Sequence, residues 1–134
     1  MSSATPRVGS SETLRAVTRA LADAPCRAVI VTGPVGPVGV VTDNDVVLAI
    51  ALGIDPDRIR ASDAMQPIPH VVKAEDAPTE VAQVMVRLGL HHVAVLDDES
   101  GVHLASSLEV LRALRSMQDA GLSSGSAVPP SARS

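Results

Sequence analysis

The chain has 134 residues, of which 46% are hydrophobic and 19% charged, and its formal net charge at pH 7 is −4. This composition is typical of an ordered globular protein, and the acidic balance argues against nucleic-acid binding, which depends on clustered Lys and Arg. The chain has no Phe, Trp or Tyr, so no aromatic platform is present on which single-stranded bases could stack.

Cysteine usage and the N-terminus predict a cytoplasmic protein. Cys26 is the single cysteine, so a disulfide framework and a set of zinc-binding cysteines are both excluded, and we expect Cys26 to be a small buried hydrophobe. The first ten residues contain no apolar segment typical of a signal peptide, and the longest apolar run, from Val46 to Leu52, is too short to cross a bilayer. We therefore expect neither export by a signal peptide nor a membrane partner.

The first predicted unit spans residues 10–60 and follows a flexible N-terminus, residues 1–9. Little strand signal precedes residue 10, so we expect the first strand of this unit to be truncated. The other predicted elements of the unit are a helix between Ser10 and Pro25, with Ser10 or Ser11 as its N-cap, a strand pair at 28–31 and 38–41, and a helix that opens at Asp43 and ends at Gly53.

The second predicted unit spans residues 61–120 and repeats this order. A tail over residues 121–134 follows it, because Ser, Gly and Pro dominate there without periodic apolar residues. The predicted elements are a strand at 71–72, a helix from Asp76 to Gly89, strands at 93–96 and 102–105, and a helix that opens at Ser106.

The two units are interpreted as copies of one repeat. The strand 28–31 placed on 93–96 gives an offset of 65, whereas Thr42 placed on Ser106 gives 64, which we attribute to a shorter second turn. Each copy has apolar residues on more faces than one copy can cover, so the copies must pack against each other. The predicted fold class is therefore α/β (α+β), with two small three-stranded sheets, each accompanied by two helices.

The segment from Gly39 to Asp45, GVVTDND, contains the strongest candidates for ligand-binding residues. A hydroxyl and a carboxylate three residues apart at a helix start, here Thr42 and Asp45, can both hydrogen-bond a vicinal diol of one small ligand. The same spacing is also that of a helix-capping pair, which stabilises a helix by about 1 kcal/mol. The spacing alone leaves both interpretations open.

No pattern of residues indicates catalysis or a metal site. His91 and His92 are neighbours on a predicted strand and so point to opposite faces, and no carboxylate or cysteine lies at matching spacing. Ser106 lies near His103, but its position at a helix start explains it as a cap. We therefore expect a protein that is not an enzyme and binds no metal.

The segment from Gly39 to Asp45, with a strand pair before it and an apolar helix after it, resembles the ribose-binding signature of the cystathionine-β-synthase (CBS) domain. The sequence ASDAM, residues 61–65, resembles the lead-in that precedes each copy in that family. The resemblance covers nearly the whole predicted folded region. It implies tandem CBS repeats, a stand-alone Bateman-type module, packed with pseudo-two-fold symmetry.

The resemblance also implies roles for single residues. Thr42 and Asp45 would hold the ribose of a nucleotide, and Arg27, at the start of the preceding strand, would meet its phosphate. Arg27 can alternatively be only a solvated strand end. The lead-in of the other repeat, with Met65 and Ile68, would flank the base.

The second copy departs from the family pattern. His103 stands in place of the glycine, Ser106 in place of the threonine and Glu109 in place of the aspartate. A longer carboxylate displaces the acceptor, and a histidine crowds a cleft where the backbone must come close to a ligand. At the offset of 65, His92 matches Arg27 and becomes the candidate phosphate contact. We therefore expect one working site and a second, weak site.

The resulting functional prediction is a non-catalytic regulatory or sensor module. It would bind AMP, ADP, ATP or a related adenosyl ligand as a regulatory ligand in the cleft between the repeats, with no further cofactor. The resemblance also implies a homodimer formed through helices, and a downstream protein partner that the sequence does not identify. The alternative is a ligand-silent scaffold of the same fold, in which Thr42 and Asp45 only cap a helix.

Overall fold

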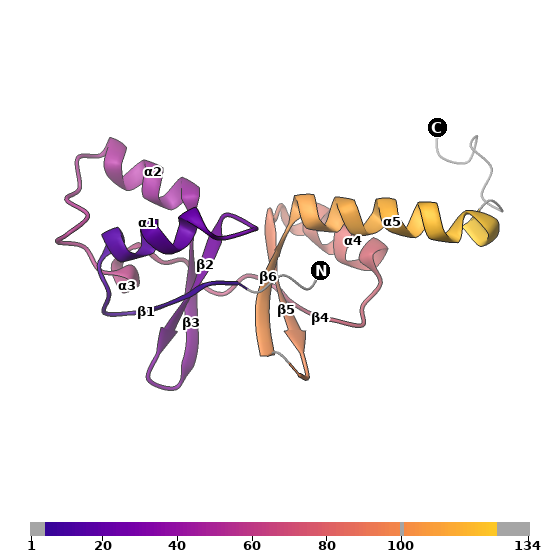
Figure 1. Cartoon of the computed structure of the whole chain (residues 1–134), viewed down its shortest axis with the longest axis horizontal. Coiled ribbons are helices and arrows are strands. Elements are labelled where there is room, and N and C mark those ends of the chain that lie inside the picture. The colour runs from indigo at the N-terminus through magenta and orange to yellow at the C-terminus, as the bar shows by residue number, and fades with distance from the viewer. Residues whose placement is uncertain (1–4, 100, 126–134) are drawn as a thin grey trace.

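The computed structural model describes residues 5–99 and 101–125, with side chains as far as residue 119. Figure 1 shows two similar halves joined where their sheets meet. The first half contains β1 (Arg7–Gly9), α1 (Leu14–Ala22), β2 (Ala28–Gly33), β3 (Gly36–Thr42) and α2 (Asp43–Ala51). The short helix α3 (Ala61–Ala64) leads into the second half, which contains β4 (Val71–Lys73), α4 (Pro78–Leu88), β5 (His92–Asp97), β6 (Gly101–Ser106) and α5 (Ser107–Gly125).

Each half has a three-stranded sheet of the same topology. The strand orders are β1-β2-β3 and β4-β5-β6. In both sheets the first pair of strands is parallel, with a helix as the crossover, and the second pair is an antiparallel hairpin. This arrangement confirms the predicted mixed α/β fold of two repeats.

Equivalent residues of the two repeats are 64 positions apart. Ala28 pairs with Thr42 in the first hairpin, and His92 pairs with Ser106 in the second. The offset of 65 predicted for the first strand of each hairpin is therefore wrong by one residue. The offset of 64 also aligns the helices, because it places Val17, which is fully buried, on Val81, which is 1% exposed.

The wrong offset of 65 arose from the lengths assumed for the two hairpin turns. The first hairpin turns between Gly33 and Gly36, whereas the second turns between Asp97 and Gly101, so the second turn is the longer one. The first hairpin recovers the missing residue in a β-bulge at Val38, where the register between β2 and β3 shifts.

Alternate residues of the central strands belong to different cores. Val29 and Val31 pack under the helices of the first repeat, and the equivalent Val93 and Val95 pack under those of the second. The residues between them meet in a layer between the two sheets, so both faces of each sheet are buried, as continuous apolar strands indicate. This layer consists of Cys26, Ala28, Ile30, Val40, Ala94 and Leu104.

Local signals set the helix ends. Thr42 and Asp45 form a capping box at the start of α2, and Gly89 ends α4 with a φ of +67°, a left-handed conformation that favours glycine. The N-cap of α1 is Thr13 rather than the predicted Ser10 or Ser11. In the described part of the chain, no helix combines the length and the apolar character needed to cross a membrane.

Both chain ends differ from the prediction. β1 is as long as its equivalent β4, so the first strand is not truncated. It forms because Val8 is 5% exposed in the core and lies beside Val31 of the buried β2, a tertiary effect that three residues cannot reveal by periodicity. At the other end α5 passes the predicted tail boundary at residue 121, because extending a helix is easier than nucleating one. Residues 126–134 of the predicted tail lie outside the described residues.

Candidate functional site

Thr42 and Asp45 meet where β3 ends and α2 begins. Asp45 Oδ2 accepts hydrogen bonds from the Thr42 amide (2.8 Å) and the Thr42 hydroxyl (3.0 Å). The Asp45 amide in turn donates to Thr42 Oγ1 (3.3 Å). The capping interaction that the spacing left open is therefore present. It uses one carboxylate oxygen of Asp45 and leaves Oδ1 outside the cap.

The segment that joins the repeats crosses β3 beside this helix start. Gln66 donates its amide to the Val40 carbonyl (2.8 Å), and Val40 donates its amide to the Gln66 carbonyl (2.9 Å). The side-chain amide of Gln66 also donates to Asp45 Oδ1. The helix start of one repeat and the lead-in of the other thus form one site. Sequence analysis missed Gln66, although its place directly after Met65 in the lead-in was a usable signal.

Gly39 makes the close crossing possible. A Cβ at this position would lie 2.6 Å from the Gln66 carbonyl oxygen and 2.7 Å from Met65 Sδ, closer than nonbonded atoms approach. Met65 is half-buried against the first core, and Ile68 is half-buried against the layer between the sheets. The structure therefore places Met65 at the crossing and Ile68 against the layer between the sheets, while the contact of either residue with a base remains a prediction.

Arg27 lies at the end of the first sheet where β3 ends and α2 begins. Its carbonyl accepts a hydrogen bond from the Asp43 amide of α2 (3.1 Å), and its side chain is exposed. Its φ of +59° is left-handed, which is uncommon for a residue with a side chain. Within the described residues Arg27 forms no ion pair, so its guanidinium is available to an anion near the helix start.

The equivalent site of the second repeat is built differently. Its helix start is capped in the same way, because the Ser106 amide donates to Glu109 Oε1 (3.2 Å) and the Glu109 amide donates to Ser106 Oγ (3.3 Å). His103, the equivalent of Gly39, is buried at 7% exposure. The N-terminal segment reaches the sheet through a side chain, since the Leu104 amide donates to Thr5 Oγ1 (2.8 Å). Arg7 also donates a side-chain hydrogen bond to the Val102 carbonyl, so among the described residues the N-terminal segment contacts β6 through two side chains.

The histidines of β5 correct the alignment of the second site. The Ser107 amide donates to the His91 carbonyl (2.9 Å), as the Asp43 amide does to that of Arg27. His91, not His92, is therefore the equivalent of Arg27, and the alignment that made His92 a phosphate contact is wrong by one residue. His92 Nε2 instead lies 2.9 Å from the Cys26 carbonyl oxygen, between the two repeats.

Cys26 is buried, as predicted. Burial raises the pKa of its thiol, and the nearby negative charge of Glu109 raises this pKa further. A thiol that stays protonated is a poor nucleophile and a poor metal ligand. No group of three or more His, Cys, Asp or Glu side chains that could hold a metal lies in the described ranges 5–99 and 101–119.

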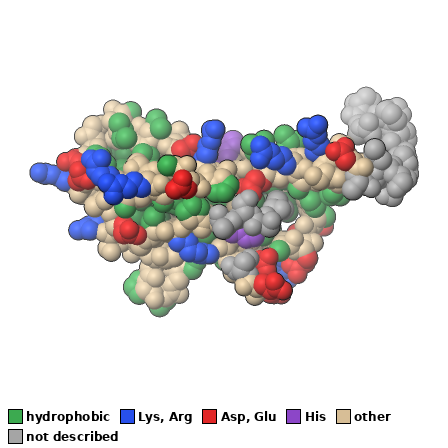
Figure 2. Space-filling view, in the orientation of Figure 1, with side chains coloured by type: hydrophobic (Ala, Val, Ile, Leu, Met, Phe, Trp, Pro, Cys, Tyr) green, Lys and Arg blue, Asp and Glu red, His purple; other side chains and the backbone are tan. Residues whose placement is uncertain are grey.

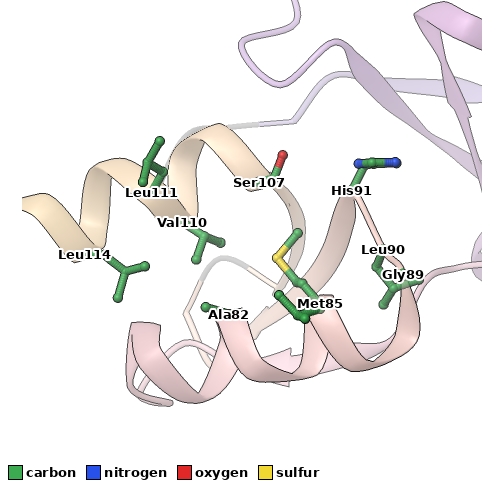
Figure 3. Close-up of a pocket in the computed structure, with 10 residues that line it drawn as sticks. Ala82, Met85, Gly89, Leu90, His91, Ser107, Val110, Leu111 and Leu114 are labelled. Carbon is green, nitrogen blue, oxygen red and sulfur yellow. The ribbon is translucent and has the colours of Figure 1, made fainter. Parts of the chain in front are cut away.

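Two cavities lie away from Asp45. The first is an apolar groove of about 460 Å³ between α4 and α5, in which Met85 and Val110 point toward each other and His91 lies at one end (Figure 3). Its rim is apolar as well, since Val86 is 83% exposed and Leu111 is 60% exposed. Exposed apolar surface of this extent is typical of protein contacts.

The second cavity, of about 390 Å³, is acidic. Figure 2 shows acidic side chains gathered at the lower right of the molecule. Because like charges repel, these carboxylates disfavour a nucleotide phosphate in this cavity. Its lining consists of Ala74, Glu75, Asp97, Asp98 and Glu99.

The fold and the site define a class: a tandem β/α module in which a capped helix start of one repeat meets the lead-in of the other. Residues 61–116 match the family model described as the CBS domain. The second repeat thus matches the CBS domain, and because the first repeat has the same topology and register, the chain has the fold of a CBS domain pair.

Solved structures share this fold. A CBS domain protein from Pyrobaculum aerophilum, complexed with AMP, is 21% identical with a TM-score of 0.68, over 86% of this chain and 95% of that one. Hypoxic Response Protein I, solved with two coordinated zinc ions, is 25% identical with a TM-score of 0.65, over 84% of this chain and 92% of that one. The cytosolic domain of the Mg²⁺ channel MgtE, in complex with ATP, is 25% identical with a TM-score of 0.60, over 81% of this chain and 44% of that one. No curated protein sequence matches the chain.

Proposed function

We propose that this chain is a non-catalytic sensor module that binds an adenosine-type nucleotide between its two repeats. The carrying observation is the juxtaposition of Thr42 and Asp45 with Gln66, because it joins a helix start of one repeat to the lead-in of the other. The AMP complex of the Pyrobaculum aerophilum protein and the ATP complex of MgtE support a nucleotide as the ligand class. A ligand at this position touches both repeats, so it can change how they pack.

The chemistry of the site suits a ribose diol and a phosphate. Asp45 Oδ1 is the carboxylate oxygen that the cap does not use, and it can accept a hydrogen bond from a ribose hydroxyl. Arg27 is exposed near the same helix start and supplies a charge for phosphate. Since the chain has no aromatic residue, the adenine would lie against aliphatic side chains, for which Met65 and Ile68 are the candidates.

Isothermal titration with AMP, ADP and ATP tests the proposal, with Asp45→Asn as the test variant. Asparagine keeps the size and much of the capping ability but removes the charge. We expect the affinity to fall about tenfold or more, because a hydrogen bond to a charged group contributes about 1.5–3 kcal/mol. Glu109→Gln is the matched control in the second repeat, and we expect it to change the affinity little. Unchanged affinity in a folded Asp45→Asn protein would refute the site assignment.

The same titration tests the proposed asymmetry between the repeats. We expect about one nucleotide per chain, because the buried His103 stands where the first repeat has Gly39 and because Glu109 replaces the aspartate. Two equal sites per chain would show that neither substitution closes the second cleft.

A ligand-silent scaffold is the second candidate function. It is favoured by one observation: both carboxylate oxygens of Asp45 already have donors within the chain, Thr42 on Oδ2 and Gln66 on Oδ1. Thermal shift separates the two functions, since a ligand at 100 times its dissociation constant adds about 2.7 kcal/mol to stability. An unchanged melting temperature with millimolar AMP, ADP and ATP would favour the scaffold.

The proposed module acts as a homodimer and signals to a further protein in the cytoplasm. The apolar groove between α4 and α5 is one candidate contact with a second copy, and α2 offers another aliphatic face, on which Val47 is 63% exposed and Ile50 is 56% exposed. Burying such faces in a symmetric contact removes apolar surface from water. Light scattering at tens of micromolar checks this proposal, and a monomer would count against it.

A further inference from the structure

We propose that Gln66 is an internal competitor for the nucleotide, a latch that occupies the ligand-accepting oxygen of Asp45 when the site is empty. The inference rests on the proposed function and adds a regulatory contact to it. It starts from the observation that the two carboxylate oxygens of Asp45 have different hydrogen-bond donors. Oδ2 receives both donors of the helix cap, and Oδ1 receives the side-chain amide of Gln66.

The backbone holds Gln66 in the position to compete. Its amide and carbonyl groups are both bonded to Val40, at 2.8 Å and 2.9 Å. The bridge comes this close because Gly39 has no side chain. The residue is therefore anchored beside the helix start even if its side chain turns away.

The side chain itself can be displaced. Gln66 is exposed, so water satisfies its amide once the bond to Asp45 is broken. The cap does not depend on that bond, because Thr42 donates only to Oδ2. A ribose hydroxyl can therefore replace the Gln66 amide without disturbing the start of α2.

The latch lowers the apparent affinity by the fraction of molecules in which it is open. If it is closed in about nine molecules of ten, the nucleotide binds about tenfold more weakly than to an open site. Because the Gln66 side chain is exposed and water competes for Asp45, we expect this bond to contribute no more than an ordinary net hydrogen bond, which corresponds to about a threefold to tenfold effect. Displacement also couples binding to the lead-in segment, since the donor that leaves belongs to the link between the repeats.

Titration of Gln66→Ala with AMP, ADP and ATP tests the latch. We expect its affinity to be about threefold to tenfold higher than that of the unchanged protein. Gln83→Ala, the same change at an exposed position of α4, is the matched control and should not change the affinity. In the Asp45→Asn background, the gain from Gln66→Ala should shrink, because the charged acceptor is gone.

The outcomes separate the latch from the proposed function. If the unchanged protein and Gln66→Ala bind with equal affinity, the latch is refuted and the nucleotide site stands. Weaker binding by Gln66→Ala also refutes the latch, and shows that the amide contacts the ligand. If neither protein binds any of the three nucleotides, the proposed function fails and the latch fails with it.

Discussion

Replacing Gly39 by alanine should weaken the connection between the two repeats. The new Cβ would lie 2.6 Å from the Gln66 carbonyl oxygen and 2.7 Å from Met65 Sδ. The methionine side chain can rotate, but the carbonyl oxygen belongs to a backbone that is bonded to Val40 in both directions. The lead-in must therefore move away from β3, and the two backbone hydrogen bonds lengthen or break.

The expected loss follows from those two bonds. Each contributes about 0.5–1.5 kcal/mol net, and incomplete relaxation around the methyl group adds to the cost. We expect a loss of about 2–3 kcal/mol in the free energy of unfolding. For a chain of this size, about 3–5 °C is lost per kcal/mol, so the melting temperature should fall by about 6–15 °C.

Gly33→Ala is the matched control for this prediction. Its Cβ would meet Val38 Cγ1 at 3.0 Å, and that side chain is 37% exposed and can turn away. Urea unfolding followed by circular dichroism measures both variants, and the control should lose less than about 1 kcal/mol. Equal losses in the two variants, or no loss for Gly39→Ala, would show that the crossing does not depend on a missing side chain.

Three further predictions concern other parts of the molecule. The hydrogen bond and ion pair with Arg15 lower the pKa of Asp57. The small stabilisation from this ion pair should therefore be present above the ordinary aspartate pKa and be lost as the pH falls through the lowered pKa. Asp57→Asn should remove this pH dependence from melting curves measured at low salt. Burial raises the pKa of the Cys26 thiol, so Ellman's reagent should react with it slowly at pH 8 in the folded protein and rapidly in urea. Leu111→Lys should shift the proposed dimer toward monomer in light scattering, whereas Val35→Lys, at a position 98% exposed in the first hairpin turn, should not.

Most of the fold could be predicted because its signals are local. Apolar runs bounded by Gly and Pro located all four strands of the two hairpins, and capping residues located the starts of α2 and α5. The strand β1 could not be found in this way, because Arg7–Gly9 is too short to show a period and forms only by pairing with β2. Its existence depends on a buried neighbour that lies more than twenty residues away in the sequence.

The register of the repeats shows a different limit of sequence reasoning. Apolar runs locate a strand without saying which of its residues face the helices and which face the other sheet, because both faces are buried here. An error of one residue in the offset between the repeats therefore left the apolar pattern intact, but it assigned His92 instead of His91 as the equivalent of Arg27. The observed pairing of β2 with β3, which includes a bulge that the residue types do not predict, was needed to correct the alignment.

The candidate site was predictable in its acceptor but not in the donor that already occupies it. Thr42 and Asp45 are three residues apart in one segment, so their meeting follows from helix geometry alone. Gln66 comes from the other repeat and reaches Asp45 only because two strands, a glycine and a crossing segment place it there.

The two repeats share a helix cap and differ in the segment that crosses beside it, and we propose that this difference decides which helix start responds to a ligand. In the first repeat the crossing segment is the link between the repeats, bonded through its backbone to Val40 and through its side chain to Asp45. In the second repeat it is the N-terminal segment, bonded to Leu104 through the Thr5 hydroxyl, beside a buried His103. A ligand that displaced the first segment would change the connection between the two halves of the module. The N-terminal segment also joins the halves, since the Ile30 amide of β2 donates to the Pro6 carbonyl while the Leu104 amide of β6 donates to Thr5 Oγ1, but it has no described bond to the carboxylate at the helix start. We therefore expect the proposed nucleotide at Asp45 to act on the link between the repeats, because Gln66 of that link already bonds to the same carboxylate.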